Sequence, residues 1–186
     1  MTATLVLLAV LVLGGVLLEW LEPDAATSWQ TVWAFTLIGG GVLLLGSAAV
    51  LALRAGPASQ FAAVTGVTLA GAAALTWGGP LATAILRQAD PNVKPGQSAA
   101  PGGPADPNVL LNGGWVGLLE RLAVVGTLRS GWPEGVAVIL AVKGVGRYPE
   151  LRDPGGQAAA ERFIIGTLAS VLWAAACAGV AHLVLV

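Results

Sequence analysis

The chain has 186 residues, of which 56% are hydrophobic and only 10% are charged. Soluble domains carry about 25% charged residues, so this composition excludes a soluble globular domain and a disordered chain. The net charge of −1 excludes a basic nucleic-acid-binding protein. The class of protein that fits this composition is an all-α, polytopic transmembrane helical bundle. About six helices fit the length, because one span takes about 20 residues.

The N-terminal half consists of three apolar runs of span length, at residues 2–18, 29–53 and 60–87. A signal peptide is the alternative for the first run, but it would begin with basic residues, which positions 1–4 lack, so a retained span is favoured. Within the third run, Gly79 and Pro80 are expected to bend or break the helix. Residues 1–87 are therefore predicted to form an apolar scaffold of three spans.

A loop rich in Pro and Gly, residues 88–108, is predicted to separate this scaffold from a C-terminal half of three helices, residues 109–186. The predicted helices cover residues 109–128, 134–148 and 158–186. The middle helix is short for a span, and a re-entrant segment is the alternative reading.

Small residues recur at every fourth position in two of the predicted spans. The positions are Ala62, Gly66, Ala70 and Ala74, then Gly166, Ser170, Ala174 and Ala178. Small side chains allow helix backbones to approach closely in lipid, so both stripes are predicted to pack inside the bundle. Contact with a second copy of the chain is the alternative.

The distribution of Lys and Arg predicts the orientation of a six-span protein. One side collects Arg87, Lys94, Arg147 and Arg152, and the other collects Arg54 and Arg129. Cytoplasmic loops carry the excess of basic residues, so the first side is expected to be cytoplasmic and both termini to face outward. The expected location is the cytoplasmic membrane of a cell, crossed several times.

Charged residues inside the predicted membrane segments are the most informative feature. Each costs about 2.5–3.5 kcal/mol at the bilayer centre unless it is paired or faces a cavity. Glu120 and Arg121 lie midway along one helix and Lys143 midway along the next, so a tight hairpin would pair Glu120 with Lys143. Lys143, Arg147 and Glu150 share one helix face.

The predicted site is a ligand-binding or internally paired cluster with one surplus positive charge. Its members are Glu120, Arg121, Lys143, Arg147, Glu150, Glu161 and Arg162. A surplus positive charge favours an anion such as a phosphate headgroup. No catalytic residue, metal ligand or cofactor is predicted, because Cys177 and His182 lie deep in the last span, away from this cluster.

Three segments of the C-terminal half match a pattern of bacterial membrane proteins. They are Gly-Trp-Val-Gly-Leu-Leu-Glu-Arg at 114–121, Ala-Val-Lys-Gly-Val-Gly-Arg at 141–147, and Glu-Arg-Phe-Ile-Ile-Gly-Thr-Leu-Ala-Ser at 161–170. About residues 112–180 thereby resemble a family of uncharacterised multi-pass membrane proteins of actinobacterial type. The resemblance implies that Glu120, Arg121, Lys143 and Arg147 act as one unit, and it carries no activity.

Several functions fit these features. The cluster is expected to bind an anionic lipid or a small phosphate-bearing solute. The first alternative is a structural or assembly subunit of a membrane complex, in which the charges only pair internally and fix the helix register. The second alternative is a small transporter or channel. An enzymatic function is disfavoured. Membrane lipids are the expected partners, a homo-oligomer or another membrane subunit stays open, and nucleic acid is excluded.

Overall fold

The apolar runs form helices because a backbone in lipid must satisfy its hydrogen bonds within its own segment. A computed structural model describes residues 1–20, 30–56, 58–89, 113–152 and 157–186. In these ranges there are six helices and no strand: α1 (Thr2–Trp20), α2 (Gln30–Arg54), α3 (Gln60–Ala89), α4 (Gly113–Arg129), α5 (Gly135–Arg152) and α6 (Gln157–Leu183). This confirms the predicted all-α fold with about six helices.

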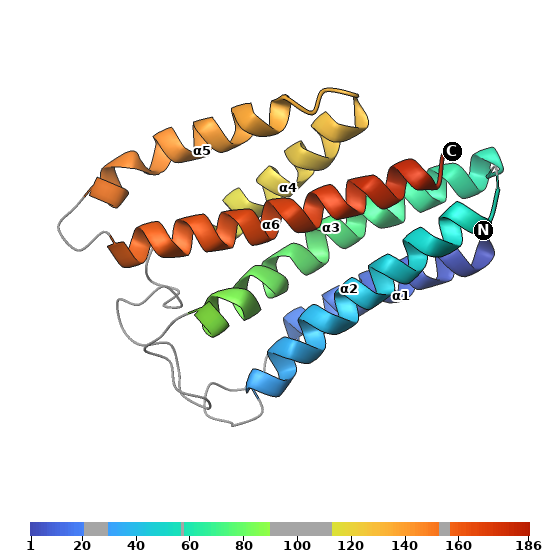
Figure 1. Cartoon of the computed structure of the whole chain (residues 1–186), viewed down its shortest axis with the longest axis horizontal. Coiled ribbons are helices and arrows are strands. Elements are labelled where there is room, and N and C mark those ends of the chain that lie inside the picture. Colours follow the sequence, from blue (N-terminus) through green and yellow to red (C-terminus); the bar gives the residue numbers. More distant parts are fainter. Residues whose placement is uncertain (21–29, 57, 90–112, 153–156) are drawn as a thin grey trace.

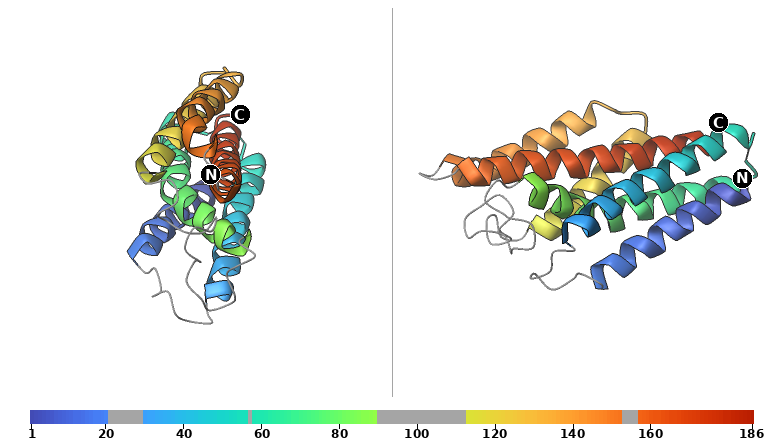
Figure 2. Two further views of the ribbon diagram at one scale, coloured as in Figure 1. Left: turned by 90° about the vertical axis from the view of Figure 1, so that its left-hand side faces the viewer. Right: turned by 60° about the horizontal axis from the view of Figure 1, so that its bottom comes forward.

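Successive helices run in opposite directions along one bundle, so both termini lie at the same end (Figure 1). Helices α3 and α6 pack against each other along the middle of the bundle. Helices α1 and α2 cover one side of this central pair, and α4 and α5 lie on the other side (Figure 2). Among the described helices, α5 is the most peripheral and packs against α4 and α6.

Three described segments are long and apolar enough to cross a membrane: Phe35–Arg54, Gln60–Ala89 and Gln157–Leu183. An apolar stretch of α1, Thr2–Leu17, is slightly shorter. Large apolar side chains such as Leu43, Phe61 and Leu172 are exposed on the outside of the bundle. An apolar exterior is what a lipid-facing surface requires, and the chain is therefore a membrane-embedded protein by composition.

The sequence leaves a bend or a break of the third helix open at Pro80, and the structure shows no break. Helix α3 continues from Gln60 to Ala89 with Pro80 inside it. Proline removes the hydrogen bond to the carbonyl four residues earlier, here that of Thr76. Helices packed among other helices tolerate this loss, because neighbouring segments and local adjustments satisfy the freed group.

The core is built from the two predicted small-residue stripes and a pair of tryptophans. Ala70 and Ala74 on α3 and Ala174 and Ala178 on α6 are buried where these helices meet, which confirms packing inside the bundle. Cys177 is also buried in this core. Close approach of the helices brings buried side chains of α1, α2, α3, α4 and α6 into one apolar cluster.

Trp77 and Trp173 stack in the middle of this core, with ring centroids 5.9 Å apart. Trp173 Nε1 donates a hydrogen bond to the carbonyl of Ala73 at 3.1 Å. Trp77 Nε1 donates to the carbonyl of Leu11 on α1. Both indole N–H groups are thus satisfied, which buried tryptophan requires.

A tight turn joins α4 to α5. Gly131 has a positive φ of 76°, a conformation that favours glycine, and the Trp132 amide donates to the carbonyl of Thr127 at 2.9 Å. Gly135 begins α5 so close to Thr127 that an added Cβ would lie 2.6 Å from its methyl group. The resulting hairpin sets α5 antiparallel to α4 and brings the middle of each helix to the same level.

Candidate functional site

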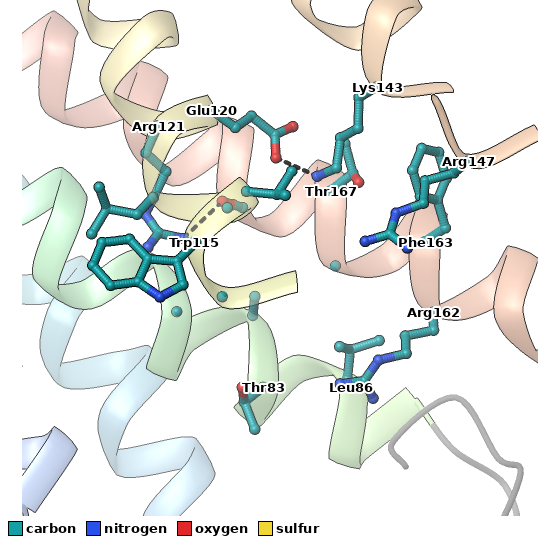
Figure 3. Close-up of a pocket in the computed structure, with 18 of the residues that line it drawn as sticks. Thr83, Leu86, Trp115, Glu120, Arg121, Lys143, Arg147, Arg162, Phe163 and Thr167 are labelled. Atoms are coloured by element: carbon teal, nitrogen blue, oxygen red, sulfur yellow. Dashed lines mark hydrogen bonds and ion pairs between the residues drawn. The ribbon is translucent and has the colours of Figure 1, made fainter. Parts of the chain in front are cut away.

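A pocket of about 630 Å³ lies between α3, α4, α5 and α6 (Figure 3). Among the described residues, five charged side chains line it: Glu120, Arg121, Lys143, Arg147 and Arg162. Four of these five are cations, so the charge of the described lining is strongly positive. Apolar side chains, including Leu75, Leu86, Val116 and Phe163, form much of the remaining wall.

The predicted ion pair between Glu120 and Lys143 forms across the α4–α5 hairpin. Lys143 Nζ donates to Glu120 Oε2, and the side chains are 17% and 3% exposed, respectively. The Lys143 ammonium also lies 5.6 Å from the centre of the Phe163 ring on α6, within the range of a cation–π interaction. Lys143 therefore connects three helices at one wall of the pocket.

Arg121 points away from this pair, toward α3 and α6. Its Nη1 donates to Ser170 Oγ at 3.3 Å, and its side chain crosses the surface of Gly78. A Cβ added at Gly78 would lie 2.2 Å from Arg121 Cδ, and one at Gly117 would lie 3.3 Å from Nη1. The two glycines thus form a slot that fits the Arg121 side chain within the bundle.

A Gly78→Ala variant is therefore expected to lose about 1–3 kcal/mol of unfolding free energy, because the new methyl group would overlap with Arg121. The matched control is Gly71→Ala on the same helix, where an added Cβ would meet nothing within 4 Å. Alanine favours helix over glycine, so this control should unfold at the same denaturant concentration as the wild type or a higher one. Equal losses in the two variants would contradict the proposed slot.

The cations are distributed along the length of the pocket. Arg162 lies in the second turn of α6, and Ser170, which receives the Arg121 bond, lies about 12 Å further along this helix. Figure 3 shows Arg162 beside Leu86 at the end of α3, and Arg147 close to Phe163. The pocket thus reaches from the helix ends, near Arg162, toward the middle of the bundle at Ser170.

Two of the predicted site residues are not among the described residues that line the pocket. Glu161 is exposed and does not line the pocket; its Oε1 accepts a hydrogen bond from Gln157 Nε2 at 3.5 Å. Consecutive helix residues point about 100° apart, so Arg162 faces the pocket while Glu161 does not. Glu150 belongs to α5, but its side chain is outside the described residues.

Sequence reasoning missed several uncharged residues of the pocket. Phe163 and Thr167 follow Arg162 on α6, and Trp115 on α4 is an exposed lining residue at the helix start. The sequence did contain a signal for these residues. Phe163 and Thr167, and Gly166 and Ser170, are each four residues apart, so each pair shares a helix face close to that of Arg162. Within the described ranges, no three His, Cys, Asp or Glu side chains are grouped so that they could hold a metal ion.

Comparison of the chain with protein-family models, curated proteins and solved structures finds no match.

Proposed function

We propose that this chain is a multi-pass protein of a bacterial cytoplasmic membrane that binds a phosphate-bearing anion in the pocket between α3, α4, α5 and α6. The observation that carries the proposal is the lining of this pocket, where four cations accompany one carboxylate. Basic pockets between transmembrane helices are typical binding sites for lipid phosphate groups. The ligand is an anionic lipid headgroup or a small phosphate ester with the same chemistry.

The size and walls of the pocket favour a ligand with an organic part. A volume of about 630 Å³ lies in the range of sites that hold small molecules and far exceeds a bare phosphate ion. Leu86 and Phe163 are apolar walls beside the cations, and Trp115 is an exposed ring at the start of α4. Cations next to apolar walls suit an amphiphile, whose phosphate meets the cations and whose apolar part meets the walls.

The charge distribution favours access from the cytoplasmic side. Arg87 in the last turn of α3 and Arg147 on α5 lie at the same end of the bundle as Arg162. Among the described residues this end carries more Lys and Arg, which assigns it to the cytoplasm by the positive-inside rule. Anionic lipids give the cytoplasmic leaflet a negative surface potential, so suitable ligands are available there.

The proposal is tested by replacing Arg147 and Arg162, the two arginines of the pocket lining that lie toward the cytoplasmic end of the bundle. An Arg147→Gln/Arg162→Gln variant is expected to bind phosphatidylglycerol at least about tenfold more weakly in nanodiscs, because hydrogen bonds to charged groups contribute about 1.5–3 kcal/mol each. Native mass spectrometry and titration calorimetry measure the bound lipid and its affinity. Arg54→Gln at the opposite end of the bundle is the matched control and should bind as the wild type does.

Two further arms identify the source of the phosphate. Nanodiscs of phosphatidylcholine alone give the background, and soluble glycerol 3-phosphate competes for the site. Displacement of the lipid only by another anionic lipid would assign the site to headgroups. Binding of glycerol 3-phosphate in phosphatidylcholine discs would assign it to a soluble solute. Wild-type protein that binds neither probe above background would contradict the proposal.

A structural role in a membrane assembly is the second candidate. The Glu120–Lys143 pair links α4 to α5, and the Arg121–Ser170 bond links α4 to α6, so these charges also hold helices in register. An assembly subunit would purify in gentle detergent with a second polypeptide in a fixed ratio. A chain that purifies alone and binds phosphatidylglycerol would favour the binding function instead.

A further inference from the structure

Glu120 is the one carboxylate among the described side chains that line the cationic pocket. Its Oε2 accepts a hydrogen bond from Lys143, whereas its Oε1 is buried without a hydrogen-bond partner in the described part of the chain. A buried ion pair is favourable only when further hydrogen bonds satisfy the remaining lone pairs. The carboxylate is therefore incompletely compensated, and a purely stabilising role does not account for it.

Lys143 is well placed to change partner. Its side chain is partly exposed and lines the pocket, and its ammonium has three donors on a flexible four-carbon stem. Rotation of this stem can turn the ammonium from Glu120 toward the pocket interior. Arg121 lacks this freedom, because Gly78 and Gly117 enclose its side chain and Ser170 accepts from its guanidinium.

We propose that the Glu120 carboxylate is an internal competitor: it occupies the Lys143 ammonium while the pocket is empty, and the phosphate-bearing ligand must displace it. This inference rests on the proposed anion-binding function and adds the residue that sets its affinity. Carboxylate and phosphate oxygens make the same kind of charge-assisted hydrogen bond to an ammonium. Because two anions compete for one cation, Glu120 weakens binding of every anion and selects those that interact with Lys143 more strongly.

The test is a Glu120→Gln variant, which keeps the size of the side chain and removes its charge. Loss of the competing carboxylate is expected to strengthen binding of phosphatidylglycerol in nanodiscs by at least about tenfold, the equivalent of one charge-assisted hydrogen bond. A Glu120→Gln/Lys143→Gln variant is the matched control. It retains two side chains of similar length but lacks the ammonium, so its affinity should fall below that of the wild type.

A second measurement uses the wild-type protein and does not depend on the folding of a Glu120 variant. The only lysines of the chain are Lys94 and Lys143, so selective isotope labelling of lysine side chains gives few NMR signals. A Lys143→Arg variant identifies the signal of Lys143. Saturation with phosphatidylglycerol should shift this signal, because the ammonium exchanges a carboxylate for a phosphate partner.

The outcomes separate this inference from the function on which it rests. Equal or weaker lipid binding by a folded Glu120→Gln protein would overturn the competitor role while leaving anion binding in place. If that variant does not fold, an unshifted Lys143 signal in lipid-saturated wild type would overturn it instead. Wild-type protein that binds neither phosphatidylglycerol nor glycerol 3-phosphate would overturn both.

Discussion

A Lys143→Met variant is expected to lose about 3–5 kcal/mol of unfolding free energy, because removal of one partner leaves a buried charge uncompensated. The remaining Glu120 side chain is only 3% exposed, and water has almost no access to it. The loss is measured by unfolding in mixed micelles of a mild detergent and a denaturing one. Helix content recorded at the same detergent ratios shows whether the whole bundle unfolds.

The matched control replaces both members of the pair. A Glu120→Leu/Lys143→Met protein removes the buried charge along with its partner, so it should recover most of the stability lost by the single variant. The reverse single variant, Glu120→Gln, should lose less than Lys143→Met, because the Lys143 side chain is 17% exposed and lines an open pocket. A Lys143→Met protein as stable as the wild type would show that Glu120 does not depend on this ammonium.

A Trp77→Ala variant is expected to lose about 3–5 kcal/mol, because a large core side chain is replaced by a cavity. Trp77 stacks on Trp173, its indole donates to the carbonyl of Leu11, and the ring packs close to the backbones of Gly15 and Gly41. One side chain thereby joins α1 and α2 to the central pair α3 and α6. Unfolding in the same mixed micelles measures the loss.

Trp132→Ala is the control for this second variant. Trp132 lies in the α4–α5 turn and is 51% exposed, so its removal should change stability by less than about 1 kcal/mol. Trp77→Phe should fall between the two, because it keeps most of the ring volume and loses the N–H donor to Leu11. Equal losses for Trp77→Ala and Trp132→Ala would contradict the central position of Trp77.

The sequence predicted the helices well because apolar runs in lipid have few alternatives to a helix. Arg54 and Arg129 lie where α2 and α4 end. The absence of a break at Pro80 has a physical cause. The rule that proline ends a helix comes from its missing N–H, whereas the environment decides whether that loss can be tolerated. Sequence alone does not show which neighbours surround position 80.

The candidate site was predictable only in part. Opposite charges at the same depth of two helices in a tight hairpin are stabilised when they pair with each other. The Glu120–Lys143 pair could therefore be predicted. The directions in which Arg121 and Glu161 point could not be predicted, because they depend on how each helix is rotated about its axis. A shift of one residue turns a side chain by about 100° around that axis. The direction of Arg121 depends on Gly78 of α3, which is distant in sequence and carries no side chain to signal the contact.

Tryptophan shows a similar limit. Trp115 and Trp132 near helix ends are exposed, as is typical of rings at a membrane interface. Trp77 and Trp173 are buried mid-helix, and their contacts with Leu11 and Ala73 join residues far apart in the chain. Residue type alone therefore does not separate an anchoring ring from a core ring.

The burial of Cys177 has a consequence for chemical reactivity. It is the single cysteine of the chain, and its side chain has no exposed surface among the packed core residues of α3 and α6. Oxidants and thiol reagents therefore have no access to it while the bundle is folded. The folded wild-type protein should therefore not react with thiol reagents. A cysteine introduced at any level of the pocket would then be the one thiol available for labelling.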